Sequence, residues 1–278
     1  MNAIEIKNLS KEYKDFRLDN ISLTLPCGCI IGLVGENGAG KSTTIKLILD
    51  MIKKSGGEIR LLGQNSNACS KEDIGVVLEE NGLPESFNAK EINTVFKNIY
   101  KQWNAQAFFS YLNKFNIPQN KKIKIFSKGM KMKLNIAVAL SHNAKLLILD
   151  EATSGLDPVV RDEILDIFND FTRDETHSVL ISSHIVSDLE KLCDYIAFMH
   201  RGKLILCEEK DELLNHYSIV QCDEDTLNGI DKADIISVRK SDYAVRAVVK
   251  NTAVTEKMNS MPVNLEDLFV YMIRGQEK

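Results

Sequence analysis

FSKGMKMKLNIAVALSHNAKLLILDEATSGLD, residues 126–157, is the stretch of sequence that decides the fold. Its apolar run Leu146–Leu149 predicts a buried strand, and Asp150 and Glu151 follow that strand directly. Ligands of α/β proteins bind beyond the carboxyl ends of such strands. A carboxylate there suits Mg²⁺, and a second carboxylate beside it can act as a general base on water. We therefore expect a hydrolytic site at the end of this strand.

A second motif lies upstream, at residues 35–42. The sequence GENGAGKS matches every fixed position of G-x-x-x-x-G-K-[ST] and lies between a predicted strand, Ile30–Val34, and a predicted helix. In this motif the backbone N–H groups and the helix N-terminus face phosphate groups. The predicted nucleotide-binding residues are Gly35, Glu36, Asn37, Gly38, Ala39, Gly40, Lys41, Ser42 and Thr43.

The two motifs together predict a chemical role for each of several residues. Lys41 is expected to bridge the β- and γ-phosphates, and Thr43 to bond the α-phosphate. Ser42 and Asp150 are expected to hold Mg²⁺, and Glu151 to act as the general base. An Asp-Glu pair after a strand is by itself usually the solvated start of a helix. The phosphate-binding motif upstream makes the functional interpretation the stronger one.

Composition narrows the class of protein. The chain has 278 residues, of which 44% are hydrophobic, and a net charge of −4. This acidic balance gives no general electrostatic reason to bind nucleic acid or anionic lipid. No apolar run reaches the roughly 18–20 residues that cross a bilayer, and the N-terminus lacks a signal-peptide pattern. We expect a cytosolic chain without a membrane span, whose six scattered cysteines are free thiols.

The hydrophobic pattern indicates three regions. Residues 3–34 read as short strands, and a helix then begins near Lys41 and carries apolar residues as far as Ile52, with Gly56-Gly57 as its stop. Residues 84–143 are helical in pattern and rich in aromatic side chains, which we expect to pack against one another. The pattern returns to strand, helix and strand from Leu146 onward.

Beyond residue 210 the motifs end. Residues 211–278 look like a small mixed α/β region whose last clear helix is Leu265–Ile273. We therefore expect residues 1–210 to form one nucleotide-binding domain with a helical part at about 84–143, followed by an accessory region at 211–278. The sequence gives that accessory region no chemical role.

The order of the motifs resembles the ATP-binding cassette (ABC) family over roughly residues 3–210. The resemblance rests on Phe126-Ser127-Lys128-Gly129-Met130, the strand that ends in carboxylates, Ser154-Gly155-Leu156-Asp157 and His184. It implies an α/β fold: a P-loop NTPase core with a mixed sheet, an antiparallel β subdomain and an inserted helical subdomain, followed here by the small C-terminal α/β region. It also implies an ATPase that uses ATP and Mg²⁺.

The resemblance assigns further residues. Tyr13 matches the aromatic residue that stacks on adenine, and His184 matches the histidine that contacts the γ-phosphate. Ser127 and Gly129 match the signature, usually Ser-Gly-Gly-Gln, which meets the γ-phosphate bound to the opposite subunit. Asp157 matches the aspartate that links the two sites across the dimer. These roles are implied by the family pattern.

Simple helix chemistry gives the same positions a second interpretation. Ser127 is a good N-cap for the helix that follows it, and such a helix N-terminus binds anions. Asp157 stands before Pro158, which is typical of an N-cap followed by proline at the first helical position. Both residues are thus expected to cap helices whatever else they do.

The chain departs from the family pattern at two positions. Glu79 stands where the family usually has glutamine, so it is either a ligand for Mg²⁺ or water or a solvated loop residue. Lys128 lies within the signature, in a run of six lysines between residues 121 and 133. A charge run is usually a solvated face, but Lys128 could also raise the potential around the partner's ATP.

The resemblance implies partners as well. We expect a homodimer or a heterodimer with a second ATP-binding subunit, attached to a transmembrane permease at the inner face of the cell membrane. The permease is expected to dock just beyond Glu79-Glu80, and export is the favoured direction. The alternative is a soluble ABC ATPase that acts on ribosomes or DNA. A P-loop GTPase or kinase would leave Ser127–Met130 and His184 without a role.

Overall fold

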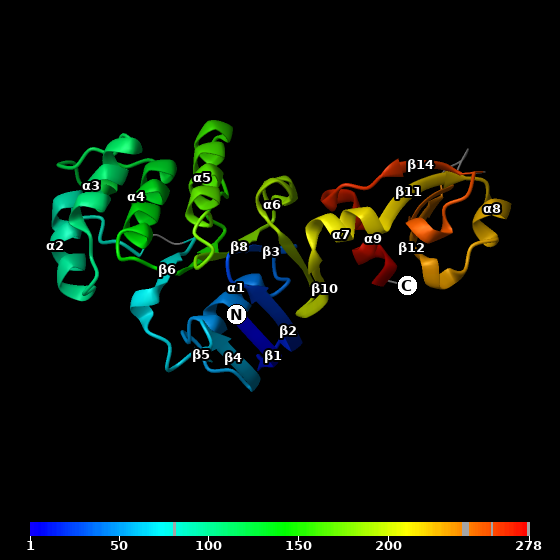
Figure 1. Ribbon diagram of the computed structural model, residues 1–278, viewed down its shortest axis with the longest axis horizontal. Helices are drawn as coiled ribbons and strands as arrows, with labels where there is room; N and C mark the ends of the chain where they lie inside the picture. The colour runs from blue at the N-terminus through cyan, green and yellow to red at the C-terminus, as the bar shows by residue number, and fades with distance from the viewer. Residues whose placement is uncertain (80–81, 241–244, 257, 277–278) are drawn as a thin grey trace. The chain divides into compact units, whose positions relative to one another are not determined.

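In the computed structural model the chain divides into two units, Met1–Cys207 and Glu208–Lys278 (Figure 1). The structure describes residues 1–79, 82–240, 245–256 and 258–276. Each unit has its own sheet or sheets and its own buried core. Within the part of the chain that the structure describes, every helix is too short or too polar to span a bilayer.

A six-stranded sheet with the order β10-β9-β3-β8-β7-β6 forms the centre of the first unit. The strands from β9 to β6 pair in parallel. Their residues are almost all buried because helices and the second sheet cover both faces, which explains their unbroken apolar runs. The bounds are β3 Ile30–Gly35, β6 Ile74–Val77, β7 Leu146–Asp150, β8 Ser178–Ser183, β9 Tyr195–His200 and β10 Lys203–Glu209.

A second, four-stranded sheet with the order β2-β1-β4-β5 packs against the helix that follows β3. Its long strands pair antiparallel and alternate buried and exposed residues, so that one face joins the core. The expected short strands at residues 3–25 are thus parts of two longer ones. The bounds are β1 Asn2–Glu12, β2 Arg17–Pro26, β4 Gly56–Leu61 and β5 Gln64–Asn65.

The helix after the phosphate-binding motif, α1 (Lys41–Ile48), is shorter than its apolar pattern predicted. Asp50 has a positive φ of 57°, a left-handed conformation that typically ends a helix. Ile52 therefore lies beyond the helix, although it still packs on the core. The expected stop, Gly56-Gly57, instead begins strand β4.

Three helices form the helical region and stand together at one side of the first unit (Figure 1). They are α2 Ala89–Ile99, α3 Ala105–Lys114 and α4 Lys128–Leu140. A capping box of Asn88 and Glu91 begins α2. The aromatic side chains stack on one another, as in the pair Phe96 and Trp103, whose ring centroids are 5.5 Å apart. The aromatic residues of this region are thus packing residues, as expected.

The remaining helices of the first unit begin near the ends of the central strands. Helix α5 (Pro158–Phe171) follows β7, and α6 (Val186–Leu192) follows β8. The predicted caps are confirmed: Ser127 Oγ accepts from Met130 N at the start of α4, and Asp157 Oδ1 accepts from Val160 N at the start of α5. Pro158 occupies the first turn of α5. Short 3₁₀ turns lie at Lys71–Asp73 and Ile123–Ile125.

The second unit contains a four-stranded antiparallel sheet with the order β12-β13-β11-β14. Its own small core includes Val220, Ala247 and Val249. The final helix, α9, has the predicted start but runs three residues further than predicted. The bounds are α7 Lys210–His216, β11 Tyr217–Cys222, α8 Glu224–Asn228, β12 Ile235–Lys240, β13 Val245–Lys250, β14 Asn259–Pro262 and α9 Leu265–Gln276, with 3₁₀ turns at Lys232–Asp234 and Asn251–Ala253.

Candidate active site

The carboxyl edge of the central sheet brings the predicted catalytic residues together. Asp150 at the end of β7 pairs in register with Ser182 of β8, and Val34 of β3 pairs with Ser183. The phosphate-binding loop therefore leaves β3 at the same edge at which Glu151 and His184 leave β7 and β8. This convergence follows from parallel pairing, since parallel strands end on one side of the sheet.

The phosphate-binding loop curls around the start of α1. Gly40 has a φ of 109°, and a Cβ at this position would lie 2.9 Å from Leu18 Cδ1, so that only glycine fits. Gly40 is the N-cap position of α1, and no acidic side chain occupies the first turn of that helix. The N-terminal backbone N–H groups of α1 are thus available for an anion.

Lys41 is the buried cation of this loop, with only 5% of its surface exposed. Its Nζ donates to Gly35 O at 2.7 Å and lies 3.3 Å from Glu151 Oε1. A buried ammonium group needs such partners, because an unpaired charge in the interior is costly. These contacts fix Lys41 at the floor of the loop, between the backbone and the predicted general base.

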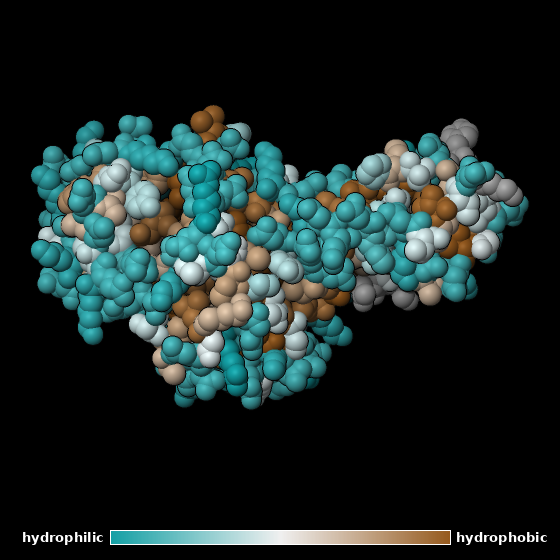
Figure 2. All heavy atoms as spheres, in the orientation of Figure 1, coloured by the Kyte–Doolittle hydropathy of each residue, from teal (hydrophilic) through white to brown (hydrophobic). Residues whose placement is uncertain are grey.

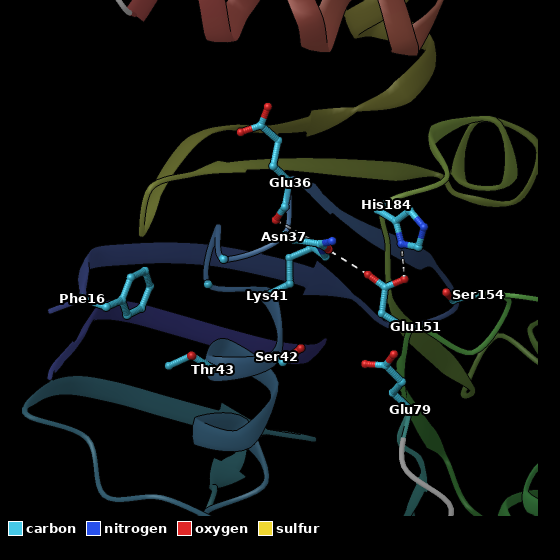
Figure 3. Close-up of a pocket in the computed structure, with 12 residues that line it drawn as sticks. Phe16, Glu36, Asn37, Lys41, Ser42, Thr43, Glu79, Glu151, Ser154 and His184 are labelled. Carbon is cyan, nitrogen blue, oxygen red and sulfur yellow. Dashed lines mark hydrogen bonds and ion pairs between the residues drawn. The ribbon is translucent and has the colours of Figure 1, made fainter.

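A cavity of about 500 Å³ opens above Lys41 (Figure 3). Its size falls within the range of small-molecule sites. It brings together ten of the predicted residues, whereas Gly35, Ala39, Asp150 and Tyr13 are not on its wall. Its lining consists of Phe16, Glu36, Asn37, Gly38, Gly40, Lys41, Ser42, Thr43, Glu79, Glu151, Ser154 and His184.

The Ser42 hydroxyl and the Asp150 carboxylate, two oxygen groups that can bind a metal ion, lie close together. Ser42 Oγ donates to Asp150 Oδ1 at 3.1 Å, and Ser182 Oγ donates to the same oxygen at 2.6 Å. Hydroxyl and carboxylate oxygens are the ligands that Mg²⁺ prefers, usually together with substrate phosphates and water. The donor set that Ser42 and Asp150 provide therefore fits a magnesium ion bound together with a nucleotide.

Glu151 is held in an unusual conformation. Its φ of 52° lies in the left-handed region, which is uncommon for residues other than glycine. Its backbone N–H donates to Ser182 Oγ, and its Oε2 lies 2.7 Å from His184 Nδ1. Backbone strain of this kind persists when neighbouring groups hold it, and it concentrates at functional sites. Figure 3 shows Lys41 and His184 meeting the Glu151 carboxylate from two sides.

Glu79 points toward the same cavity from the end of β6 (Figure 3). The structure therefore places this carboxylate beside Ser42 and Glu151, where its charge would bear on a bound phosphate. Glu80 lies outside the described residues. The two roles predicted for Glu79, a ligand for Mg²⁺ or water and a solvated loop residue, both stay predictions.

The aromatic residue on the cavity wall is Phe16, which the sequence analysis missed. Tyr13 and Phe16 lie at the two ends of the turn between β1 and β2, where Tyr13 N donates to Phe16 O. Phe16 packs beside Gly40, whereas Tyr13 is 48% exposed and stands next to Lys11. Ser182 was missed as well, because nothing in the sequence distinguishes it from other serines near strand ends. Ser154 was quoted as part of a motif, but its place on the cavity wall was not predicted.

The signature residues line a different cavity. Ser127, Gly129 and Asp157 share a hollow of about 280 Å³ between the starts of α4 and α5. Lys128 and Gly155 also line it. Among the described residues, no side chain lines both this cavity and the one above Lys41. We name the cavity above Lys41 the phosphate-loop cavity, and the hollow lined by Ser127, Gly129 and Asp157 the signature cavity.

The fold and the phosphate-loop cavity define the class of protein: a P-loop nucleotide-binding ATPase. Residues 18–154 match a protein family described as ABC transporter. The lantibiotic transport ATP-binding protein SrtF of Streptococcus pyogenes is 37% identical over 211 residues, covering 75% of this chain and 91% of that protein. The ABC transporter ATP-binding protein YtrB of Bacillus subtilis is 28% identical, covering 99% of each.

Solved structures agree with this assignment. The ATP-binding subunit of an ABC transporter superposes with a TM-score of 0.69 at 27% identity, covering 76% of this chain and 91% of that one. An ATP-binding cassette solved as a dimer in a post-hydrolysis state has a TM-score of 0.67, with 74% of this chain and 98% of that one covered. At 20% identity this second likeness shows the fold. The chain belongs to the ABC transporter family and is an ATP-binding ABC ATPase.

Proposed function

We propose that two copies of this chain enclose two ATP molecules between them and thereby drive a separate membrane permease. The observation that supports the proposal is the separation of the phosphate-loop cavity from the signature cavity. If Ser127 and Gly129 bind the γ-phosphate, that phosphate must belong to a second subunit. ATP would then favour the closed dimer, and hydrolysis would release it.

Each subunit supplies most of the groups that act on its own nucleotide. Lys41 lies where it would neutralise the β- and γ-phosphates, and the N–H groups of the loop would orient them. Glu151 would accept a proton from the attacking water, while His184 holds the Glu151 carboxylate in place. Mg²⁺, held by Ser42 and Asp150, would offset further phosphate charge.

A shallow groove on the helical region supports the permease as partner. It measures about 240 Å³ and lies between the edge strand β6 and helices α2 and α4. Val76, Leu83, Phe96 and Tyr100 line it, and Val95 and Ile99 are exposed on α2. Figure 2 shows a mostly hydrophilic surface with apolar residues gathered in a few places. Exposed apolar side chains that gather in this way mark protein-binding sites. We infer that a helix of the permease docks here, at the cytoplasmic face of the membrane.

The direction of transport is inferred from relatives. SrtF is a lantibiotic transport protein, and BcrA of Bacillus licheniformis, 36% identical over 73% of this chain and 68% of its own length, is a bacitracin transport protein. Both proteins are named for the transport of a particular compound, and we infer export as the direction for this chain too. Purification from native membranes tests the partner: recovery with ribosomes or DNA, and without a membrane protein, would contradict the proposal.

The central experiment uses Glu151→Gln, which removes the general base and keeps the shape of the side chain. With saturating Mg²⁺ and ATP we expect this variant to sediment as a dimer and to hydrolyse ATP roughly 10²-fold or more slowly. Without nucleotide it should sediment as a monomer. Lys41→Ala in the same background is the control and should stay monomeric.

Two results would contradict this scheme. A Glu151→Gln variant that hydrolyses ATP at the normal rate would show that Glu151 is not the general base. A variant that is inactive but remains monomeric with bound ATP would show that a second copy does not complete the site, as expected if a different subunit were the partner.

A further inference from the structure

The lysines around the signature differ in whether an acidic side chain forms an ion pair with them. Lys122 pairs with Glu91 at 2.8 Å, Lys131 pairs with Glu85 at 2.5 Å, and Lys133 pairs with Glu163. Lys128 lies among them, yet no ion pair or hydrogen bond of its ammonium group is found among the described residues. Of the two lysines that line the signature cavity, Lys128 is thus the one whose charge is not offset by an acidic side chain among the described residues.

The side chain of Lys128 extends over the turn before α5. Gly155 in that turn has a φ of 67°, and a Cβ built on it would lie 2.8 Å from Lys128 Nζ. The positive φ favours glycine at this position, and the short distance shows that the Lys128 ammonium group lies directly over Gly155. This contact places the charge of Lys128 at Gly155, and both residues line the signature cavity.

The other charges of the signature cavity are already engaged. Lys133 is paired with Glu163, and Asp157 Oδ1 accepts from Val160 N as the cap of α5. No acidic side chain occupies the first turn of α4, so the N-terminal N–H groups of that helix add positive potential. A cavity with an unneutralised cation, a serine hydroxyl and a helix N-terminus is complementary to an anion.

We propose that Lys128 binds the terminal phosphate of the ATP that the phosphate loop of a second copy holds. This inference rests on the proposed two-copy arrangement and names a residue that the usual Ser-Gly-Gly-Gln signature does not contain. Lys128 thereby adds a charged contact across the dimer, in addition to those of Ser127 and Gly129. Its contribution should depend on ionic strength, since Lys128 is exposed until the dimer forms.

The test compares dimer dissociation constants in the Glu151→Gln background by sedimentation, with saturating Mg²⁺ and ATP. Lys128→Met removes the charge and keeps the apolar stem, and Lys128→Arg keeps the charge. Lys124→Met, an exposed lysine of the same run that lies outside both cavities, is the matched control for net charge.

One charged hydrogen bond contributes about tenfold in affinity, and the dimer contains two such contacts, so we expect Lys128→Met to weaken dimerisation roughly 100-fold. The dimer dissociation constant of Lys128→Met should also change less with salt concentration than that of the parent. Lys128→Arg and Lys124→Met should stay close to the parent, and thermal melting should show that all variants are folded.

Four outcomes would overturn the inference. Lys128→Met could dimerise as tightly as the parent, or Lys124→Met could weaken the dimer equally, which would indicate a general effect of charge. Failure of Lys128→Arg to retain affinity would show that charge is not the cause. If the Glu151→Gln parent itself stays monomeric, the two-copy proposal fails first, and this inference fails with it.

Discussion

The phosphate-loop cavity and the signature cavity belong to the same unit but differ in how their charges are satisfied. In the first, Lys41 is buried and contacts both Gly35 O and Glu151 Oε1. In the second, Lys128 is exposed and has no acidic partner among the described residues. One cavity is a nearly complete site with an internal network, and the other presents an ammonium group without an acidic partner among the described residues.

This difference shows how one chain can require a second copy. In the network of Lys41, Glu151 and His184, the first two residues are buried, and the contacts among the three order the network without an outside group. The exposed donors around Ser127 gain a partner only when an anion arrives. Nucleotide bound in the first cavity is the anion that the second cavity of another copy would meet.

The largest effect that tests this comparison is expected from Lys41→Ala. Loss of the ammonium group removes the main cation of the phosphate loop and leaves the buried Glu151 carboxylate with His184 as its remaining partner. We expect ATP hydrolysis to fall by roughly 10³-fold or more, because single preorganised donors contribute about 10²–10³ in rate. Lys46→Ala, an exposed lysine on the same helix, is the control in a steady-state ATPase assay. Comparable losses in both variants would contradict the role of Lys41.

A smaller effect separates the two aromatic residues at the edge of the phosphate-loop cavity. Stacking of a base on an aromatic ring contributes about 1–3 kcal/mol, so we expect Phe16→Ala to raise KM for ATP roughly 10-fold with little change in kcat. Tyr13→Ala, outside the cavity wall, should leave KM unchanged. The reverse result would return adenine stacking to Tyr13, as the family pattern implied.

The smallest effect concerns the helical region that carries the signature. His142, two residues beyond α4, is 1% exposed, stacks on Tyr100 and has its Nδ1 2.9 Å from Glu72 O. Burial lowers its pKa below the ordinary value of 6.5. The folded state thus binds this proton less readily than the unfolded state, so that stability is lost as pH falls below about 6.5.

We expect that loss to have a slope of no more than about 1.4 kcal/mol per pH unit. His142→Asn keeps a hydrogen-bond donor and does not titrate, so its stability should depend less on pH between 7 and 5. Chemical denaturation at several pH values measures the difference. Equal slopes for the two proteins would show that His142 does not cause the acid sensitivity.

Much of the phosphate-loop cavity could be predicted because its residues are contiguous. Gly35–Thr43 act largely through their own backbone, and Asp150 and Glu151 end a strand whose burial is visible in its composition. Parallel pairing then places both segments at one edge. By contrast, the end of α1 was predicted wrongly. The apolar pattern continues to Ile52, and the left-handed conformation of Asp50 that ends the helix has no strong sequence signal.

The sequence by itself determined the class of fold, the phosphate-binding loop and the caps at Ser127 and Asp157, because each depends on local backbone chemistry or on a short periodic pattern. Only the tertiary structure decided that Phe16 reaches the cavity and Tyr13 does not, and that His184 meets Glu151. It also decided that the signature lies apart from the phosphate loop of its own chain. These outcomes depend on how distant strands and turns pack. Contacts between segments far apart in the sequence produce no recognisable pattern in either segment.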